Sequence, residues 1–227
     1  MKQLWTDPLY RLFVFGAYGT LFQDDFHQIP GLAEATQGEA SAKEAYTLWH
    51  AKQREYAWVR SLIGRWTNYD VIAEDALAFA LSAYGMNSEE TQSAFLKTYQ
   101  SPVLYPDVIP FLEIMKEETM QAAILSDGTH ETLELGLNST QVKGFFDKVI
   151  SAEDVDMYKP SPLIYRLVQQ LMGVQPEEVV YFSANPWDIA GAATAGFTTV
   201  WVNRSGAPFD NLHTTPAFTV ESLEELI

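Results

Sequence analysis

The sequence predicts an α/β fold in which helices flank a parallel sheet, with a helical cap inserted after the first strand. Short apolar runs alternate with helical segments from residue 103 to the end of the chain, which is typical of βαβ units. Another apolar run lies near the start and is followed by a long interval without a convincing strand. We therefore expect a core of residues 1–23 and 103–227 and a cap of residues 24–102.

The first strand is predicted at Arg11–Gly16, because a buried parallel strand is a continuous apolar run and the glycines here place a turn at its carboxyl end. Similar runs predict further strands at Gln121–Ser126, Lys148–Ser151, Val179–Ser183, Thr198–Val202 and Phe218–Val220. The helices predicted between them are Asp107–Glu117, Glu131–Leu137, Pro162–Met172 and Trp187–Ala195.

The inserted interval is predicted to be helical throughout. Ala42–Ile63 carries large apolar side chains near helical spacing, and Val71–Tyr84 is apolar on one side. Ligands of open parallel sheets bind beyond the carboxyl ends of the strands, so we expect the site in the cleft between core and cap. The many aromatic residues of the cap fit packing onto the core, and they also fit the surface of a homodimer, which we predict to form through the cap.

Composition excludes several classes of function. Thirty acidic residues against fourteen basic ones give a formal charge of −16, which repels phosphate backbones and anionic lipids. Binding to nucleic acid or to a membrane surface is therefore not expected, although a local pocket can still take a small anion. The absence of cysteine excludes a disulfide framework, a thiolate nucleophile and a zinc site built on sulfur.

The ends and apolar stretches of the chain give no sign of membrane insertion or export. The first residues lack a basic patch followed by an apolar run, and no apolar stretch approaches the roughly 20 residues of a membrane span. We expect a cytoplasmic protein that uses no cofactor.

Polar residues gather where the predicted strands end. The segments are Phe15–Leu21 (FGAYGTL), Ile124–Gly128 (ILSDG), Tyr158–Pro160 (YKP), Tyr165 and Ser183–Asp188 (SANPWD). A hydroxyl, a lysine and a Ser/Asn/Asp cluster can converge on one small anionic group. Each segment alone is weak evidence, because a buried lysine is as often a structural ion pair and a serine after a strand is often only a helix cap. Their order and spacing together are far more specific.

These ordered segments resemble the motifs of the haloacid-dehalogenase superfamily, specifically its (S)-2-haloacid dehalogenase, type II, branch. That branch typically has F-D-A-Y-G-T-L where this chain has Phe15-Gly-Ala-Tyr-Gly-Thr-Leu21. Its cap motif L-W-R-x-K-Q-L-E-Y-x-W-L-R resembles Leu48-Trp-His-Ala-Lys-Gln-Arg-Glu-Tyr-Ala-Trp-Val-Arg60. The resemblance covers nearly the whole chain and implies a Rossmann-like core with an inserted helical cap.

The resemblance implies hydrolysis of a carbon–halogen bond beside a carboxylate. In the family an aspartate displaces the halide and forms an ester, which water then cleaves. The catalytic positions of the family correspond here to Gly16, Thr20, His50, Lys159, Tyr165, Ser183, Asn185 and Asp188, and the substrate-binding positions to Ala17, Tyr18, Ser126, Asp127 and Trp187. Lys159 would balance the charge of the nucleophile, and Ser126 would hold the substrate carboxylate. Ser183, Asn185 and Asp188 would orient Lys159 and the hydrolytic water.

Three departures from the branch pattern fall within this predicted site. Gly16 stands in place of the nucleophilic aspartate, His50 in place of an arginine near the leaving halide, and Asp127 in place of an asparagine. Because all three occur together, natural divergence is favoured over an engineered change. Tyr18 replaces the second acidic residue of the superfamily's first motif, so no magnesium site is expected.

Three hypotheses for function follow. The leading one is a protein that has lost the normal hydrolytic dehalogenation and retains a pocket for a small carboxylate. The second is an active hydrolase of a 2-haloacid or related small acid that uses water activated by His50, since histidine accepts protons near neutral pH. The third is a non-catalytic binding or interaction protein. Asp24 or Asp25 could turn inward as a substitute carboxylate, but solvated loop residues are the favoured interpretation.

Overall fold

The computed structural model describes residues 4, 7–23, 39–86 and 88–227. Its sheet has six strands in the order β3-β2-β1-β4-β5-β6, and every neighbouring pair is parallel. The strands are β1 (Leu12–Phe15), β2 (Gln121–Ser126), β3 (Lys148–Ser151), β4 (Val179–Ser183), β5 (Thr198–Val202) and β6 (Phe218–Val220). The predicted α/β fold with a parallel sheet is confirmed.

The register of the central strands brings the polar motifs together. Phe15, the last residue of β1, pairs with Ile124 on β2 and with Phe182 on β4. All three strands are buried, as their continuous apolar runs predict. Because parallel strands end at the same edge of a sheet, Ser126, Gly16 and Ser183 follow one another in that order along the edge.

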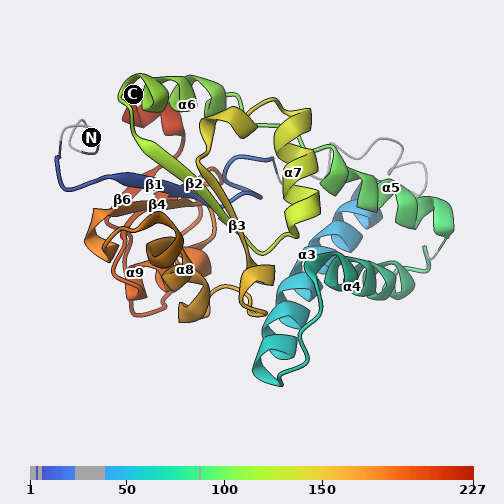
Figure 1. The fold of residues 1–227 in the computed structure, drawn as a ribbon. Coiled ribbons are helices and arrows are strands. Elements are labelled where there is room, and N and C mark those ends of the chain that lie inside the picture. The colour runs from blue at the N-terminus through green and yellow to red at the C-terminus, as the bar shows by residue number, and fades with distance from the viewer. Residues whose placement is uncertain (1–3, 5–6, 24–38, 87) are drawn as a thin grey trace.

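Helices cover both faces of the sheet (Figure 1). The helices α6 (Val108–Glu117) and α7 (His130–Ser139) pack on the face that carries Phe13 and Phe15. The helices α8 (Pro162–Met172) and α9 (Pro186–Thr194) pack on the opposite face. Short 3₁₀ turns lie at Lys143–Phe145, Ala152–Asp154, Pro176–Glu178 and Leu223–Leu226. The alternation of side chains along β1 thus divides the core into two apolar layers.

In the described part of the segment between β1 and α6, the cap consists of the helices α3 (Glu39–Leu62), α4 (Tyr69–Ala83) and α5 (Glu89–Gln100), which lie to one side of the sheet in Figure 1. They bury a separate apolar cluster, in which Trp49 packs edge-on against Phe95 and its indole Nε1 donates to the carbonyl of Ala73 at 2.8 Å. In the part of the chain that is described, no helix is both long and apolar enough to cross a membrane.

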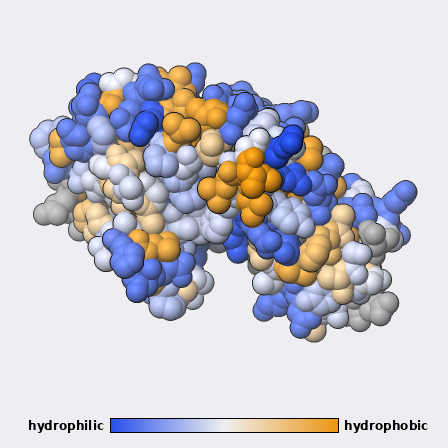
Figure 2. All heavy atoms as spheres, turned by 90° about the horizontal axis from the view of Figure 1, so that it is seen from below, coloured by the Kyte–Doolittle hydropathy of each residue, from blue (hydrophilic) through white to orange (hydrophobic). Residues whose placement is uncertain are grey.

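Specific hydrogen bonds join cap and core. Trp58 on α3 donates its indole Nε1 to the carbonyl of Lys159 at 3.0 Å. Asp70 in the first turn of α4 accepts from the hydroxyls of Thr129 and Thr132 at 3.0 and 3.1 Å. Seen from below, the molecular surface is indented between two lobes (Figure 2). These bonds hold the cap against the strand ends on which the polar motifs lie.

A second set of bonds fixes the loop after β1. Arg204 donates both terminal nitrogens to the carboxylate of Asp107, at 2.8 and 3.1 Å, and Nη2 also donates to the carbonyl of Thr20 at 2.9 Å. Burial by itself would raise the pKa of Asp107, but hydrogen bonds from Arg204, from the amide of Leu223 and from Ser222 hold it below its usual range. The ionised cluster therefore anchors Thr20 to the C-terminal part of the core.

Candidate active site

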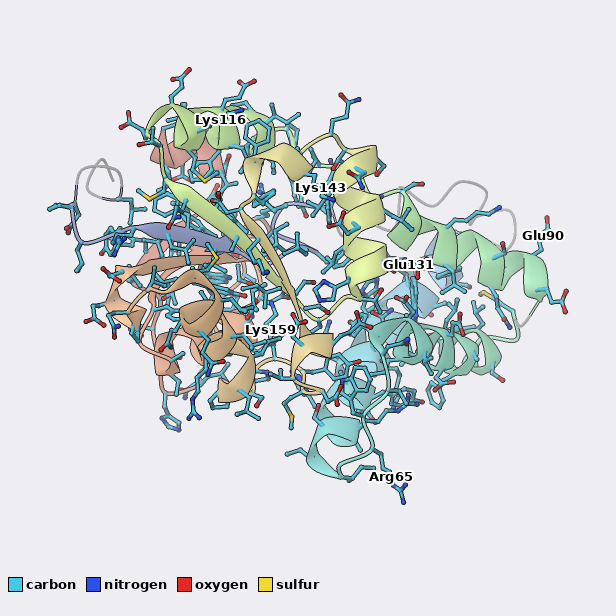
Figure 3. The ribbon with its side chains drawn as sticks, in the orientation of Figure 1. Arg65, Glu90, Lys116, Glu131, Lys143 and Lys159 are labelled. Carbon is cyan, nitrogen blue, oxygen red and sulfur yellow. The ribbon has the colours of Figure 1, made fainter. Side chains whose placement is uncertain are left out.

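A cavity of about 70 Å³ lies at the carboxyl edge of the sheet, between the core and α3. Most of the residues predicted from the sequence line it: Gly16, Ala17, Tyr18, His50, Ser126, Asp127, Lys159, Asn185, Trp187 and Asp188. Thr20, Tyr165 and Ser183 lie behind this wall and are fully buried. Figure 3 shows Lys159 where core and cap meet. The substitutes considered at Asp24 and Asp25 lie outside the described residues.

Gly16 leaves a small space beside three polar oxygens. A Cβ atom built on Gly16 would lie 3.3 Å from Thr20 Oγ1 and 3.4 Å from both Ser183 Oγ and Asp188 Oδ2. The backbone of Gly16 does not adopt a positive φ, so its conformation does not require glycine. The residue is held in place by its amide, which donates to the carbonyl of Phe182 at 2.9 Å.

Lys159 and Asp188 form a buried ion pair, with Nζ 3.0 Å from Oδ2. The ammonium also donates to the carbonyl of Leu125 at 2.9 Å and to the hydroxyl oxygen of Tyr181 at 3.0 Å. These three acceptors use all three N–H donors of the lysine. The pair is therefore fully satisfied without a ligand.

Asp188 gathers hydroxyl donors as well. Tyr165 donates to Oδ1 at 2.7 Å, Ser183 donates to Oδ2 at 2.8 Å, and the Tyr181 hydroxyl lies within 3.0 Å of both carboxylate oxygens. Burial, and then the negative charge of Asp188, raise the pKa of both tyrosines well above the ordinary value, so both phenols stay protonated. A Cβ atom on Gly191 would overlap the phenol of Tyr165, so glycine is needed there for this contact.

Asp127 presents a second carboxylate to the cavity. Its Oδ1 accepts the backbone amide of Lys159 at 3.0 Å. Protein surrounds the carboxyl group, but part of its surface is open to the cavity. Burial raises the pKa of Asp127 to about 6, with the charge and amide of Lys159 opposing this shift and Asp188 adding to it. A substantial fraction of this carboxyl group is therefore protonated in weakly acidic solution.

The remaining core residues shape the wall through backbone contacts. Ser126 Oγ accepts the amide of Gly128 at 3.2 Å, and Ser183 Oγ accepts the amide of Asn185 at 3.2 Å. Thr20 Oγ1 accepts the amide of Ala184 at 3.0 Å, which ties the loop after β1 to the loop after β4. Burial, and then the charge of Asp70, raise the pKa of Tyr18, which keeps this phenol neutral.

The cap contributes one face of α3 to the cavity. His50, Gln53 and Arg54 lie on that face because residues three and four apart are neighbours on a helix. The ring of His50 also packs on Tyr46, with ring centroids 4.3 Å apart. Trp187, on the core side of the cavity, meets Trp58 edge-on at 5.7 Å.

The predicted site residues did not include the lining residues Gln53, Arg54 and Tyr69, or Tyr181 behind the wall. Gly128, which also lines the cavity, belongs to the predicted segment Ile124–Gly128 but was given no role. Spacing from His50 was a usable signal for Gln53 and Arg54, since i+3 and i+4 share its face. Tyr181 had a weaker signal, a hydroxyl inside an otherwise apolar strand. Tyr69 had none, because its place depends on how α4 packs.

The cavity does not fit a divalent cation. Among the described residues that line it, the carboxylates are Asp127 and Asp188, and the ammonium of Lys159 lies beside Asp188 where a cation would bind. Burial keeps the phenol of Tyr18 neutral, so this lining residue adds no third anionic ligand. Across the described ranges, no three His, Asp or Glu side chains gather closely enough to hold a metal ion.

Comparison with known proteins identifies the family to which this architecture belongs. The family model for haloacid dehalogenase-like hydrolases matches residues 10–196. An (S)-2-haloacid dehalogenase of Pseudomonas putida is 34% identical, with 94% of this chain and 93% of the relative covered. The (S)-2-haloacid dehalogenase 4A of Burkholderia cepacia is 36% identical, covering 95% and 93%.

Solved structures agree. A dehalogenase crystal structure superposes with a TM-score of 0.90 at 35% identity, covering 97% of this chain and 96% of the other. The L-2-haloacid dehalogenase of Xanthobacter autotrophicus, solved with chloropropionic acid covalently bound, gives a TM-score of 0.83 at 30% identity and 96% coverage of both chains. The chain therefore belongs to the haloacid dehalogenase-like hydrolases and is a homologue of the (S)-2-haloacid dehalogenases.

Proposed function

We propose that the protein binds a small 2-haloacid in the cavity between core and cap and replaces its halogen with a hydroxyl group in one displacement by water. The activity of its relatives, hydrolysis at carbon–halogen bonds, supports the substrate class. The single displacement is carried by one observation. Gly16 occupies the position of the family's nucleophile and has no carboxylate with which to form an ester. The normal two-step route is therefore lost.

The space at Gly16 suits the attacking water. Thr20 Oγ1, Ser183 Oγ and Asp188 Oδ2 lie 3.3–3.4 Å from the place a Cβ atom would take. An ordered water needs two to four polar partners, and these three oxygens supply them. The oxygen of this water bonds to the halogen-bearing carbon as the carbon–halogen bond breaks, the halide leaves with the bonding electron pair, and a proton passes to a base.

The other residues take supporting roles in this proposal. Ser126 and Asn185 hold the substrate carboxylate, and Lys159 with Asp188 fixes the electrostatic field around it. His50 lines the cavity from the cap and is one candidate for the base, since histidine accepts protons near neutral pH.

A second candidate is a carboxylate-binding protein without catalysis. The observation in its favour is that the three N–H groups of the Lys159 ammonium donate to Leu125, Tyr181 and Asp188, which leaves none to donate to a substrate. In this case the protein binds (S)-2-chloropropionate and releases no chloride.

The source of the product's hydroxyl oxygen tests the single displacement. Protein in excess over (S)-2-chloropropionate is incubated in H₂¹⁸O, and the 2-hydroxypropionate of the first turnover is analysed by mass spectrometry. Direct attack by water places ¹⁸O in the hydroxyl group, with one chloride released per product. An ester formed on any protein carboxylate instead yields unlabelled hydroxyl in the first turnover, and that result contradicts the proposal.

A homodimer through the cap is also proposed. The last turn of α3 exposes Val59 and Leu62, with Leu62 86% exposed, and Ile63 directly after the helix is exposed as well. Apolar surface is visible on the face seen from below (Figure 2). A second copy covering these side chains would remove them from water. Light scattering is expected to give twice the 25.5 kDa chain mass, and Leu62→Lys is expected to shift it toward one chain. A wild-type mass of one chain would refute the dimer.

A further inference from the structure

Two charged groups of the cavity wall are not used by the network around Asp188. The titratable groups that line the cavity, phenols aside, are His50, Arg54, Asp127, Lys159 and Asp188. Lys159 and Asp188 satisfy each other. His50, Asp127 and Arg54 remain; of these, the carboxylate Asp127 follows β2 in the core, and the guanidinium Arg54 lies on α3 in the cap, as does His50.

Asp127 is the less engaged of the two carboxylates. Asp188 accepts from three hydroxyl groups and from the ammonium of Lys159. Asp127 accepts through Oδ1 from the amide of Lys159, and Oδ2 has no hydrogen bond within the described part of the chain. Since its carboxyl group is partly open to the cavity, Oδ2 is the carboxylate oxygen most able to take a proton from a bound water.

Arg54 is a cation of the cap that lines the cavity. It lies one helical turn after His50 on the same face of α3, and it is partly buried at the cavity. Two neighbouring cations of this helix have acidic partners, Lys52 with Glu55 and Arg60 with Asp75. Among the described residues Arg54 has no hydrogen bond or ion pair, so its guanidinium is free to hold an anion.

At Asp127 and Arg54 this chain has a charged side chain that the branch pattern lacks, whereas at Gly16 and His50 it lacks the one that the branch has. The carboxylate absent at Gly16 is matched by one gained at Asp127, where the branch has asparagine. The arginine absent at His50 is matched by one gained at Arg54, where the branch motif has leucine. At these four positions the chain therefore has as many carboxylates and as many arginines as the branch pattern. The carboxylate and the arginine each lie at a different position of the cavity wall.

We propose that Asp127 is the base that accepts the proton of the attacking water, and that Arg54 holds the halide as it leaves. This assignment rests on the single displacement proposed above and replaces His50 as the base. The water oxygen bonds to the halogen-bearing carbon, the halide departs with the bonding electron pair toward Arg54, and the water proton passes to Asp127 Oδ2 and then to solvent. Uncharged water thereby becomes the nucleophile without any protein ester.

The pH dependence follows from the state of Asp127. The groups around it are Lys159 and Asp188, the phenols of Tyr158, Tyr165 and Tyr181, and His50 and Arg54 on the cap. Burial raises its pKa to about 6, so the carboxylate form, which alone can accept a proton, predominates above that pH. The kcat of the wild-type protein is expected to fall as the pH is lowered through about 6.

Asp127→Asn tests the base. It keeps the shape and the acceptor for the Lys159 amide, and is expected to lower kcat by at least about 100-fold and to remove the acidic limb of the pH profile. Asp210→Asn makes the same change of charge at an exposed position and is expected to leave both unchanged. If Asp127→Asn keeps the rate and the acidic limb, while His50→Gln removes them, the base is His50 and the assignment is overturned.

Arg54→Leu tests the halide contact with a readout that needs no turnover. Bromide binding, followed through tryptophan fluorescence, is expected to weaken at least about 10-fold, with Arg54→Lys intermediate. Arg65→Leu is the matched control, since Arg65 projects from the far end of the cap (Figure 3) and is exposed. Unchanged bromide affinity in Arg54→Leu overturns its role even if water-labelled product still forms. Absence of chloride release from wild type overturns the displacement and the role of Asp127 with it.

Discussion

Gly16→Asp is expected to raise the rate of chloride release from (S)-2-chloropropionate by at least about 100-fold. Removal of a covalent nucleophile commonly costs enzymes several orders of magnitude, so its restoration in a suitable site returns a large part of that factor. The new carboxylate would lie beside Thr20 and Ser183 hydroxyls and near the Lys159–Asp188 pair. Lys159 would then share its charge between two carboxylates.

The site has room for this change. The backbone of Gly16 is not left-handed, and the nearest atoms to a new Cβ are side-chain oxygens at 3.3–3.4 Å, which need to shift only by a few tenths of an ångström. In H₂¹⁸O the first-turnover product of this variant is expected to be unlabelled, because its oxygen comes from the aspartate. Gly16→Asn has nearly the same shape without a nucleophile and serves as the control. Equal rates for the two variants would refute the prediction.

Asp188→Ala is expected to lower the free energy of unfolding by about 3–5 kcal/mol, because it leaves the buried ammonium of Lys159 without a counter-charge. The same change removes the acceptor of the Tyr165, Tyr181 and Ser183 hydroxyl groups. Both side chains of the ion pair are at most 5% exposed, so water cannot replace the lost carboxylate easily. Urea unfolding monitored by circular dichroism measures the effect.

The companion variant separates lost charge from lost packing. Lys159→Met combined with Asp188→Asn removes both charges and keeps an acceptor for the hydroxyl groups. It is expected to recover about half or more of the stability lost in Asp188→Ala. A loss below about 1 kcal/mol in Asp188→Ala would contradict the view that this pair is the electrostatic centre of the site.

The fold was predictable from the sequence because its core strands are buried on both faces. Such strands are continuous apolar runs, and β2 through β6 occupy the predicted ranges, while β1 is shorter by one residue at each end. The helix α5 was harder to bound. Its segment EETQSAFLKTYQ is mostly polar, and its start depends on a local cap, in which Ser88 Oγ accepts the amide of Thr91.

The candidate site was predictable where the order and spacing of the polar segments resemble the family motifs. Lys159, Ser183 and Asp188 were identified in this way, and all three are buried at the cavity or directly behind its wall. Tyr69 was not identified, since its place at the cavity depends on the packing of α4 against the core. Tertiary contacts of this kind leave no periodic trace in a single sequence.

Ligand exchange and lysine position are mechanically linked in this protein. The indole of Trp58 on the cap donates to the carbonyl of Lys159, which is the peptide group next to the ion pair. A movement that parts cap from core to admit or release a ligand would break this bond together with those of Asp70, and would free the backbone of the lysine. Opening of the cavity and loosening of the lysine are therefore expected to occur together.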